Sequence, residues 1–167
     1  ALWNAKEQTL TLARDRLGKK PLYYGLSRKG LVFASELKAL RASGCFNCSV
    51  NRDALALYLQ ANYVPSPYSI YNDVFKLPPA SIIRFKLDDI KGRRSFDPLV
   101  YGKGNAFGKP VRYWSLRRIM EQQQSVGPVN EDEMLKEMES LLNDAVRMRM
   151  VADVPYGAFL SGGIDSS

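Results

Sequence analysis

The sequence has no histidine, only two cysteines and no long apolar run, although 46% of its 167 residues are hydrophobic. A structural zinc site needs about four nitrogen or sulfur ligands, so the single pair Cys45 and Cys48 predicts no zinc site. We expect both thiols to be reduced and to have no redox role. A membrane-spanning helix needs about 18 consecutive apolar residues, and without such a run we expect no association with a membrane.

The first residues contain no initiator methionine and no charged segment followed by an apolar one, the pattern of a secretory leader. We therefore expect a cytoplasmic protein. Ala1–Trp3 is apolar from its first position, as in a strand entered midway, and a loop with the features of a functional site lies at the other end. Both observations lead us to expect an internal piece of a longer protein, with homo-oligomerisation left open.

Lysine and arginine number 24 against 17 aspartate and glutamate residues, which gives a formal net charge of +7. A nucleic-acid-binding protein usually concentrates such charge in a stripe on one face. Here the densest basic run, Lys91–Phe96, lies in a stretch that contains glycine and proline, and the other basic residues are dispersed. We expect no nucleic-acid partner, whereas a small anionic ligand would use the same positive field.

The N-terminal part predicts an antiparallel meander of short strands. Thr9–Asp15, Pro21–Ser27 and Leu31–Leu37 are rich in Leu, Tyr, Val and Phe and are separated by glycine-containing turns. Ser27–Gly30 would form a hairpin turn. Ser35 is then expected to cap a short helix that stops at Gly44.

A second helix is predicted after Asn51, its expected cap, and before Pro65. Spacings of three and four residues predict one face of this helix made by Leu55, Tyr58, Leu59 and Asn62. The following stretch, 71–87, predicts a strand, a Pro-Pro turn and another strand. Residues 88–110 hold several glycines and prolines with mixed charge, and we expect an exposed insertion there.

The pattern becomes helical after residues 122–130, a polar stretch with Gly127-Pro128 that predicts a linker. Asn130 and Glu133 fit an N-cap with its returning acid. The helix is expected to bury one stripe: Met134, Met138, Leu141, Leu142, Ala145 and Met148. Pro155 ends this helical region, and "YGAFL", Tyr156–Leu160, then predicts a buried strand.

The change from strands to a helix, a strand and a loop predicts two domains. We expect a β-rich α+β part over residues 1–121, a linker over 122–130, and over 131–167 the start of an α/β domain with a parallel sheet. In such sheets, ligands bind where a strand ends and its loop leads into the next helix. The final loop, "SGGIDSS", occupies that position.

This loop has the composition of an anion cradle. Gly162 and Gly163 let the backbone approach a ligand closely, and successive N–H groups can point at an anion. Asp165 repels phosphate by itself and is better explained as a ligand for Mg²⁺ that bridges to phosphates. No lysine follows the glycines, so this is not a Walker loop, and holding a leaving pyrophosphate suits it better. The hydroxyl donors would be Ser161, Ser166 and Ser167.

"SGGIDSS" resembles the pyrophosphate-binding loop of the N-type ATP pyrophosphatases. Together with "ALWNAKEQTLTLARDRLGKKPLYYG", "LVFASELKAL", "YVPSPYSIYNDVFKLPPAS", "RYW" and "RMVADVPYGAFL", it resembles the glutamine-hydrolysing asparagine synthetase family. In that family a class II glutamine amidotransferase domain releases ammonia at an N-terminal cysteine. A synthetase domain then converts aspartate to asparagine through an acyl-adenylate, with release of AMP and pyrophosphate. The resemblance implies the small-molecule substrates glutamine, aspartate and ATP, with ATP and Mg²⁺ at the synthetase site.

The resemblance also assigns residues one by one. It implies that Leu160 meets the adenine of ATP and that Asp165 binds Mg²⁺. No residue of the chain matches the catalytic cysteine, and Cys45 and Cys48 do not take its place. Arg14, Asp15 and Glu36 are expected to have structural or inter-domain roles, because the sequence offers them no catalytic partner. The pyrophosphate cradle would be Ser161, Gly162, Gly163, Ser166 and Ser167.

Two alternatives stay open at this point. Relatives of this architecture act on other carboxylates, closing β-lactam rings, cyclising peptides or amidating sugar acids, and the acceptor pocket lies outside the chain. The chain could also belong to a non-catalytic protein that only binds a partner.

Overall fold

The computed structural model describes residues 1–27, 29–45, 47–91, 110–122 and 130–164. The chain divides into two compact units, Ala1–Ile119 and Met120–Ser167. The predicted boundaries 1–121, 122–130 and 131–167 stay a prediction. Among the described residues, no helix is both long and apolar enough to cross a membrane.

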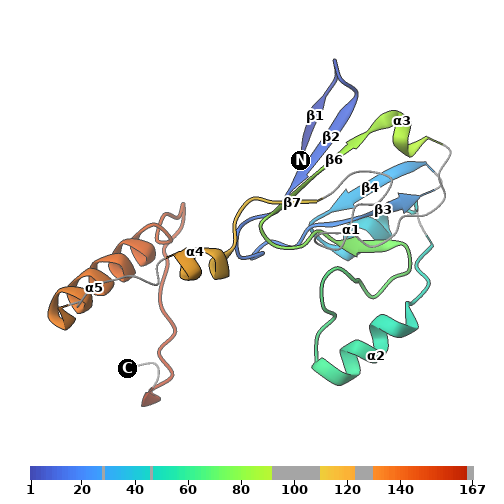
Figure 1. Ribbon diagram of the computed structural model, residues 1–167. Helices are drawn as coiled ribbons and strands as arrows, with labels where there is room; N and C mark the ends of the chain where they lie inside the picture. Colours follow the sequence, from blue (N-terminus) through green and yellow to red (C-terminus); the bar gives the residue numbers. More distant parts are fainter. Residues whose placement is uncertain (28, 46, 92–109, 123–129, 165–167) are drawn as a thin grey trace. The chain divides into compact units, whose positions relative to one another are not determined.

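The described residues of the first unit form two antiparallel sheets (Figure 1). Sheet A has four strands in the order β1-β2-β6-β7, and sheet B has three in the order β4-β3-β5. The strands of sheet A are β1 (Leu2–Asn4), β2 (Thr9–Ala13), β6 (Ser81–Lys86) and β7 (Val111–Arg112). Those of sheet B are β3 (Tyr23–Ser27), β4 (Gly30–Ala34) and β5 (Val74–Lys76).

The predicted hairpin is confirmed, because β3 and β4 pair antiparallel with Ser27 opposite Gly30. The predicted simple meander is wrong, because β2 pairs with β1 and β6 rather than with β3. The Pro-Pro turn likewise joins strands of different sheets, β5 in sheet B and β6 in sheet A. The chain therefore crosses twice between the sheets, once after β2 and once before β6.

The core contains side chains from both sheets. Leu12 and Ile83 face each other across β2 and β6, and Phe85 lies opposite Leu10 in the same ladder. The Tyr24 ring of β3 lies 6.0 Å, between ring centroids, from Phe85 and also 6.0 Å from Phe75 of β5. Fully burying a side chain of this size stabilises the fold by about 1.5–3 kcal/mol. The buried cluster is Leu12, Tyr24, Leu26, Phe75, Leu77, Ile83, Phe85 and Ile90.

Glycine at position 25 allows β5 to approach β3 closely. Gly25 lies opposite Val74 in the ladder between these strands. A Cβ atom at this position would lie only 2.4 Å from the main-chain oxygen of Asp73. Any larger residue would therefore push β5 away from the core.

Helix α1 (Leu37–Ala42) begins one residue later than a serine cap would require. Glu36 occupies the N-cap position and makes no side-chain cap bond, so the predicted cap by Ser35 is wrong. The main-chain oxygen of Glu36 instead accepts the N–H groups of Ala39 and Leu40. The helix ends before Gly44, as the sequence predicted.

Helix α2 (Arg52–Ala61) is capped by Asn51, as predicted, whose side-chain oxygen accepts the Ala54 N–H at 3.0 Å. Its buried residue is Ala54, whereas Leu59 of the predicted apolar face is 73% exposed. Asn62 belongs to the C-cap in a left-handed conformation and not to a helix face. The sequence pattern therefore predicted an apolar face, but a different side of the helix, that of Ala54, packs on the unit.

The predicted insertion lies mostly outside the described residues. Its first residues form α3 (Leu87–Ile90), which continues directly from β6 and buries Ile90. Residues 92–109 lie outside the described part. The chain is described again from Pro110, which precedes β7 and α4 (Leu116–Gln122).

The crossing from β2 to β3 is fixed by the side chain of Arg14. Its guanidinium donates to the main-chain oxygens of Leu77 at 2.7 Å, Gly18 at 2.8 Å and Lys20 at 3.0 Å. The main-chain N–H of Arg14 donates to the Ser81 oxygen at 3.0 Å. Arg14 thus ties the first crossing to the second, which supports the structural role expected for it.

Asp15 stabilises the same crossing by closing its turn. Its carboxylate accepts the main-chain N–H groups of Lys19 at 2.8 Å and Lys20 at 3.1 Å. These two hydrogen bonds, aided by the charge of Arg14, lower the pKa of the Asp15 carboxyl below its ordinary value of 3.8. The main-chain oxygen of Asp15 also accepts the Ala80 N–H at 2.9 Å.

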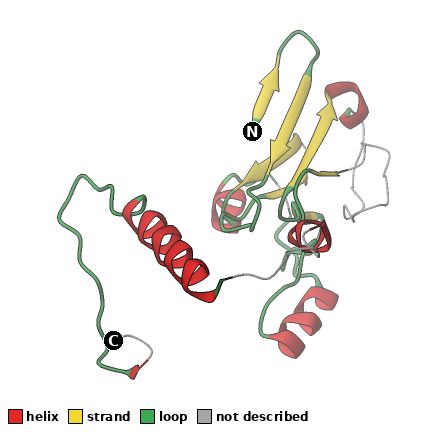
Figure 2. Cartoon of the chain, turned by 60° about the vertical axis from the view of Figure 1, so that its left-hand side comes forward, coloured by secondary structure: helices red, strands yellow, loops and turns green. Residues whose placement is uncertain are grey.

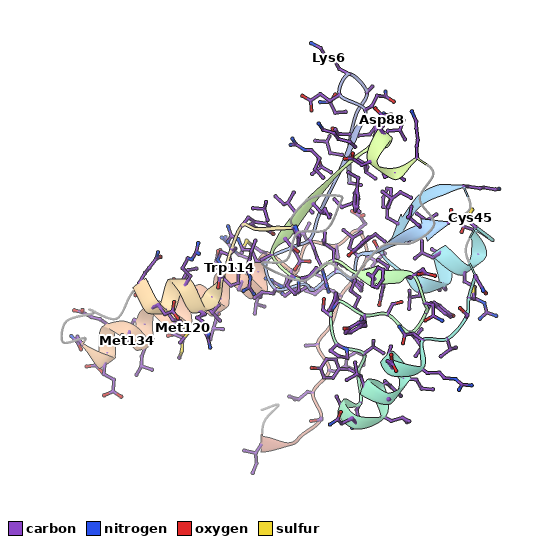
Figure 3. The ribbon with its side chains drawn as sticks, turned by 45° about the vertical axis from the view of Figure 1, so that its right-hand side comes forward. Lys6, Cys45, Asp88, Trp114, Met120 and Met134 are labelled. Atoms are coloured by element: carbon purple, nitrogen blue, oxygen red, sulfur yellow. The ribbon has the colours of Figure 1, made fainter. Side chains whose placement is uncertain are left out.

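The described part of the second unit is dominated by α5 (Glu131–Arg147). Asn130 caps it as predicted, accepting the Asp132 N–H at 3.2 Å, and acids fill its first turn. The stripe expected to be buried is exposed, because Met134 is 54% and Leu141 64% exposed. Met134 is labelled on this helix in Figure 3. Helix formation here is local, whereas burial of the stripe needs a covering element that the described part of the unit lacks.

The predicted buried strand Tyr156–Leu160 is wrong. No strand pairing is found there, and Phe159 is fully exposed. Figure 2 shows the stretch after α5 as a long loop. A strand forms only beside a neighbour that satisfies its main-chain groups, and the described residues of this unit contain no second strand. The parallel sheet of an α/β domain therefore stays a prediction.

Replacing Arg14 by alanine is predicted to lower the free energy of unfolding by about 2–3 kcal/mol, because three carbonyls lose a charged donor. Arg14→Lys is predicted to restore less than half of the loss, since an ammonium cannot reproduce the guanidinium fork. Urea titration with hydrogen exchange of the β2 and β6 amides measures both. The matched control is Arg16→Ala, at an exposed neighbouring position. Equal stability of Arg14→Ala and Arg16→Ala would contradict the assignment.

Asp15 predicts a loss of stability in acid. Because its folded-state pKa is lowered, its contribution is complete above the unfolded value of about 3.8 and disappears as the pH falls through the folded pKa. The Asp15→Asn variant should therefore be less stable than the unsubstituted protein at pH 7 and equally stable near pH 2. Thermal unfolding across this range measures the difference, and a constant difference would show that the charge is irrelevant.

Candidate functional site

The predicted anion cradle lies in the loop that follows α5. After the Met148 C-cap the chain runs without regular structure through Pro155 and Gly157 to Ser161. The charged last turn of α5 holds Arg147, bound to Asp144 at 2.8 Å. An irregular stretch thus separates the glycine loop from the capped end of α5. Nothing in the described part of the unit covers this loop.

The geometry at the two glycines suits a main-chain anion site. Gly162 has φ +73°, a left-handed conformation that side chains with a Cβ rarely adopt. No atom lies within 4 Å of the place where its Cβ would be, so backbone conformation and not crowding favours glycine there. The Gly163 N–H points toward the Ser161 hydroxyl, with 3.5 Å between nitrogen and oxygen.

The described site residues share high exposure. Leu160 is 73% exposed and Ile164 is 98% exposed. Ser161, Gly162 and Gly163 are exposed as well, so the main chain of the loop is accessible to a ligand. The structure brings these residues together as consecutive positions of one turn, without forming an enclosed pocket around them.

The remaining predicted ligands, Asp165, Ser166 and Ser167, lie outside the described residues. Within the described part of the chain, no three His, Cys, Asp or Glu side chains gather in a way that could hold a metal ion. The Mg²⁺ assignment of Asp165 therefore stays a prediction.

Other candidate residues lie in the first unit and have structural partners. Cys45 and Cys48 are free, half-buried thiols on the connection between α1 and α2, where Figure 3 labels Cys45. The Cys45 thiol donates to the Ser43 oxygen at 3.2 Å. Glu36 pairs with Lys38 at 2.8 Å on the surface, which raises the pKa of that lysine.

A hollow beside α2 has no local signal in the sequence. This hollow has a volume of about 330 Å³ and lies between Tyr68 and one face of the helix, with Asn51, Leu57 and Gln60 in its wall. Asn51 and Tyr68 meet because the chain returns past α2, with Asn51 donating its N–H to the Ile70 oxygen at 2.9 Å. Only tertiary structure brings these residues together. Asn51 serves there as the helix cap, so we assign the hollow no function.

Comparison with known families gives two matches along the chain. The family described as a glutamine amidotransferase domain matches residues 1–96, which is more than half of the chain. The family described as asparagine synthase matches residues 137–167, which include most of α5 and the whole glycine loop.

Curated relatives match almost the whole chain. A putative glutamine-hydrolysing asparagine synthetase 2 of Methanocaldococcus jannaschii is 36% identical over 99% of this chain and 28% of the relative. Asparagine synthetase 1 of Bacillus subtilis, also named as glutamine-hydrolysing, is 34% identical over 99% of this chain and 22% of the relative. A protein named amidase chry2 from Gibberella zeae is 31% identical over 99% of this chain and 21% of the relative.

The chain spans only 28% and 22% of the length of the first two relatives. The β-rich first unit agrees with the amidotransferase match, and the glycine loop lies inside the asparagine synthase match. The chain therefore belongs to the glutamine amidotransferase domain family and continues into a segment that matches the asparagine synthase family.

Proposed function

We propose that the whole protein is a cytoplasmic, ATP-dependent enzyme that converts aspartate to asparagine with glutamine as the ammonia donor. The observation that carries this proposal is the order of the two family matches, an amidotransferase segment at 1–96 and an asparagine synthase segment at 137–167. An enzyme that uses glutamine as a nitrogen source needs one site that releases ammonia and another that activates the acceptor. The two segments correspond to these two tasks.

The acceptor has to be activated because a carboxylate oxygen is a poor leaving group. Adenylation by ATP replaces it with AMP, a far better one, and expels pyrophosphate. Charge accumulates on the pyrophosphate as it leaves, and donors already oriented toward that charge lower the barrier. We assign this task to the turn of Ser161, Gly162 and Gly163, together with Ser166 and Ser167, and we assign Leu160 to the adenine.

The described loop fits such a ligand in two respects. Its main chain is accessible, and Gly162 has the left-handed conformation with which successive N–H groups can converge on an anion. A bound Mg²⁺ would neutralise phosphate charge, and we propose Asp165 as its ligand because a carboxylate oxygen is a preferred donor for this ion. The chain itself contributes the amide and hydroxyl donors.

The first unit supplies the amidotransferase part of the reaction in this proposal. No residue of the chain is assigned as the nucleophile that attacks glutamine. The contribution of the described residues is the two-sheet scaffold, held together at Arg14 and by the core around Tyr24 and Phe85. Glutamine and water would give glutamate and ammonia, and the ammonia would attack the activated aspartate.

A second acceptor is favoured by one observation. The relative named amidase chry2 covers as much of this chain as the asparagine synthetases do, at 31% identity. A different carboxylate could therefore take the place of aspartate while the loop chemistry stays the same. Assaying the full-length protein with glutamine, ATP and a panel of carboxylic acids that includes aspartate separates the two candidates.

Replacing Asp165 by alanine in the full-length protein is predicted to abolish formation of the acyl-adenylate. Glutaminase activity should remain largely intact, because it belongs to the other unit. Pyrophosphate release with aspartate and ATP, and glutamate release from glutamine, measure the two activities separately. Pyrophosphate release at the unsubstituted rate would show that the metal assignment of Asp165 is wrong.

Gly162→Ala is predicted to lower asparagine formation about tenfold. A Cβ in the left-handed conformation costs about 1–2 kcal/mol, so the variant loop would abandon the geometry that the leaving group needs. The matched control is Gly157→Ala in the same loop, where φ is not positive and a Cβ would meet nothing within 4 Å. Both variants are compared in glutamine-dependent and ammonia-dependent assays. Equal activity of the two variants would contradict a role for the Gly162 conformation.

A further inference from the structure

Tyr113 binds two separate loops of the first unit immediately after β7. Its main-chain N–H donates to the Ala80 oxygen at 2.9 Å, and its hydroxyl donates to the main-chain oxygen of Arg14 at 2.7 Å. These two acceptors belong to the second and the first crossing between the sheets. One residue therefore attaches the outgoing chain to both crossings.

The attachment to Arg14 is made at a rigid point. The Arg14 guanidinium is held by three carbonyls and its N–H by Ser81, so its main-chain oxygen has little freedom to move. A hydrogen bond to a fixed acceptor restricts its donor more than a bond to a mobile one. The Tyr113 hydroxyl reaches this acceptor across 99 positions of sequence.

The described residues on either side of Tyr113 also contact the unit. β7 is only two residues long and pairs with β6 at Ile82–Val111 and Ser81–Arg112. Tyr113 itself is 44% exposed, so the hydroxyl bond is a large part of this residue's own attachment. Pro110 is buried just before β7, and half-buried Trp114, labelled in Figure 3, follows Tyr113 directly.

The chain that joins the two units begins at this attachment. The first unit ends at Ile119, six positions after Tyr113, inside α4. The number of relative positions open to two tethered bodies grows with the length of chain between their last fixed points. Losing the Tyr113 contact would leave half-buried Trp114 and the two β7 pairs as the described attachments, so the chain would leave the unit less firmly fixed.

We propose that Tyr113 is a positioning residue that fixes where the connecting chain leaves the amidotransferase unit, and so keeps ammonia release coupled to ammonia use. This inference rests on the proposed function, because it requires that one unit makes ammonia and the other consumes it. Each glutamine hydrolysed with one water gives one glutamate and one ammonia. The ammonia either becomes the amide of asparagine or is lost to solvent, so the molar ratio of glutamate to asparagine reports the coupling.

The test compares Tyr113→Phe with Tyr63→Phe in the full-length protein. Both changes remove one hydroxyl from an exposed tyrosine of the first unit, but the described part of the chain assigns the Tyr63 hydroxyl no hydrogen bond. The hydrogen-exchange rates of the amides of Tyr113–Ser115 measure how firmly the chain is attached there. The molar ratio of glutamate to asparagine measures the coupling. Ammonia-dependent asparagine formation measures the activity of the synthetase site alone.

For Tyr113→Phe we expect exchange of these amides to become about two- to tenfold faster, the range expected for the loss of one hydrogen bond. We expect at least about a doubling of glutamate formed per asparagine, with ammonia-dependent activity unchanged. Tyr63→Phe should match the unsubstituted protein in all three measurements. A purely structural role would not change the ratio while leaving the ammonia-dependent rate intact.

Two results overturn the inference. Unchanged exchange in Tyr113→Phe shows that the hydroxyl does not hold the chain, and faster exchange with an unchanged ratio shows that the attachment does not control coupling. A failure of the proposed function looks different, because the unsubstituted protein would then form no asparagine from either glutamine or ammonia. That result removes the basis of the positioning role as well.

Discussion

The first unit depends on the guanidinium of Arg14, which donates to three main-chain carbonyls from two distant stretches of chain. A two-sheet fold has to carry its chain from one sheet to the other, and the loops that do so expose polar main-chain groups at the edge of the core. Arg14 satisfies several of them with one side chain, because its planar fork presents several N–H donors in fixed directions. The two crossings are consequently bound to each other, sixty-three positions apart at Leu77.

The packing of the core follows from the fixed position of the two crossings. With the crossings fixed, β2 and β6 align so that Leu12 faces Ile83, and β3 lies against β5 with Tyr24 beside Phe75. Tyr24 also contacts Phe85 of sheet A, so the aromatic ring joins the two sheets directly. The close approach of β5 at Gly25 completes the arrangement. The amidotransferase match lies on this scaffold, whereas the glycine loop to which we assign the nucleotide lies on a different unit with its own helix.

Local features of the fold could be predicted from the sequence. Asn51 and Asn130 cap their helices as expected, because a cap depends on a side chain and the main chain two or three residues ahead. The β3–β4 hairpin was predictable because its turn also involves only residues that are close in the sequence. The Ser35 cap failed because Glu36, one residue further on, has the extended backbone of the N-cap.

Features that depend on distant parts of the chain could not be predicted. The pairing of β2 with β6 and the division into two sheets have no local signal, so the sequence pattern predicts a single meander instead. The stripe on α5 was correctly seen as amphipathic, but its burial depends on a partner and not on the helix itself. At the candidate site, the sequence identified the glycine loop by its composition, and the structure adds the left-handed Gly162. The contact of Tyr113 with Arg14 was missed entirely, since neither residue predicts the other.

We propose that this chain belongs to an enzyme that moves the amide nitrogen of glutamine onto an acid activated as its adenylate. Incubating the full-length protein with glutamine labelled with ¹⁵N in the side-chain amide, aspartate and ATP tests it most directly. We expect asparagine carrying ¹⁵N in its side-chain amide, together with AMP and pyrophosphate in equal amounts. Labelled asparagine accompanied by ADP and inorganic phosphate would contradict the proposed role of the loop, and no labelled product with aspartate or any other acid would contradict the proposed reaction.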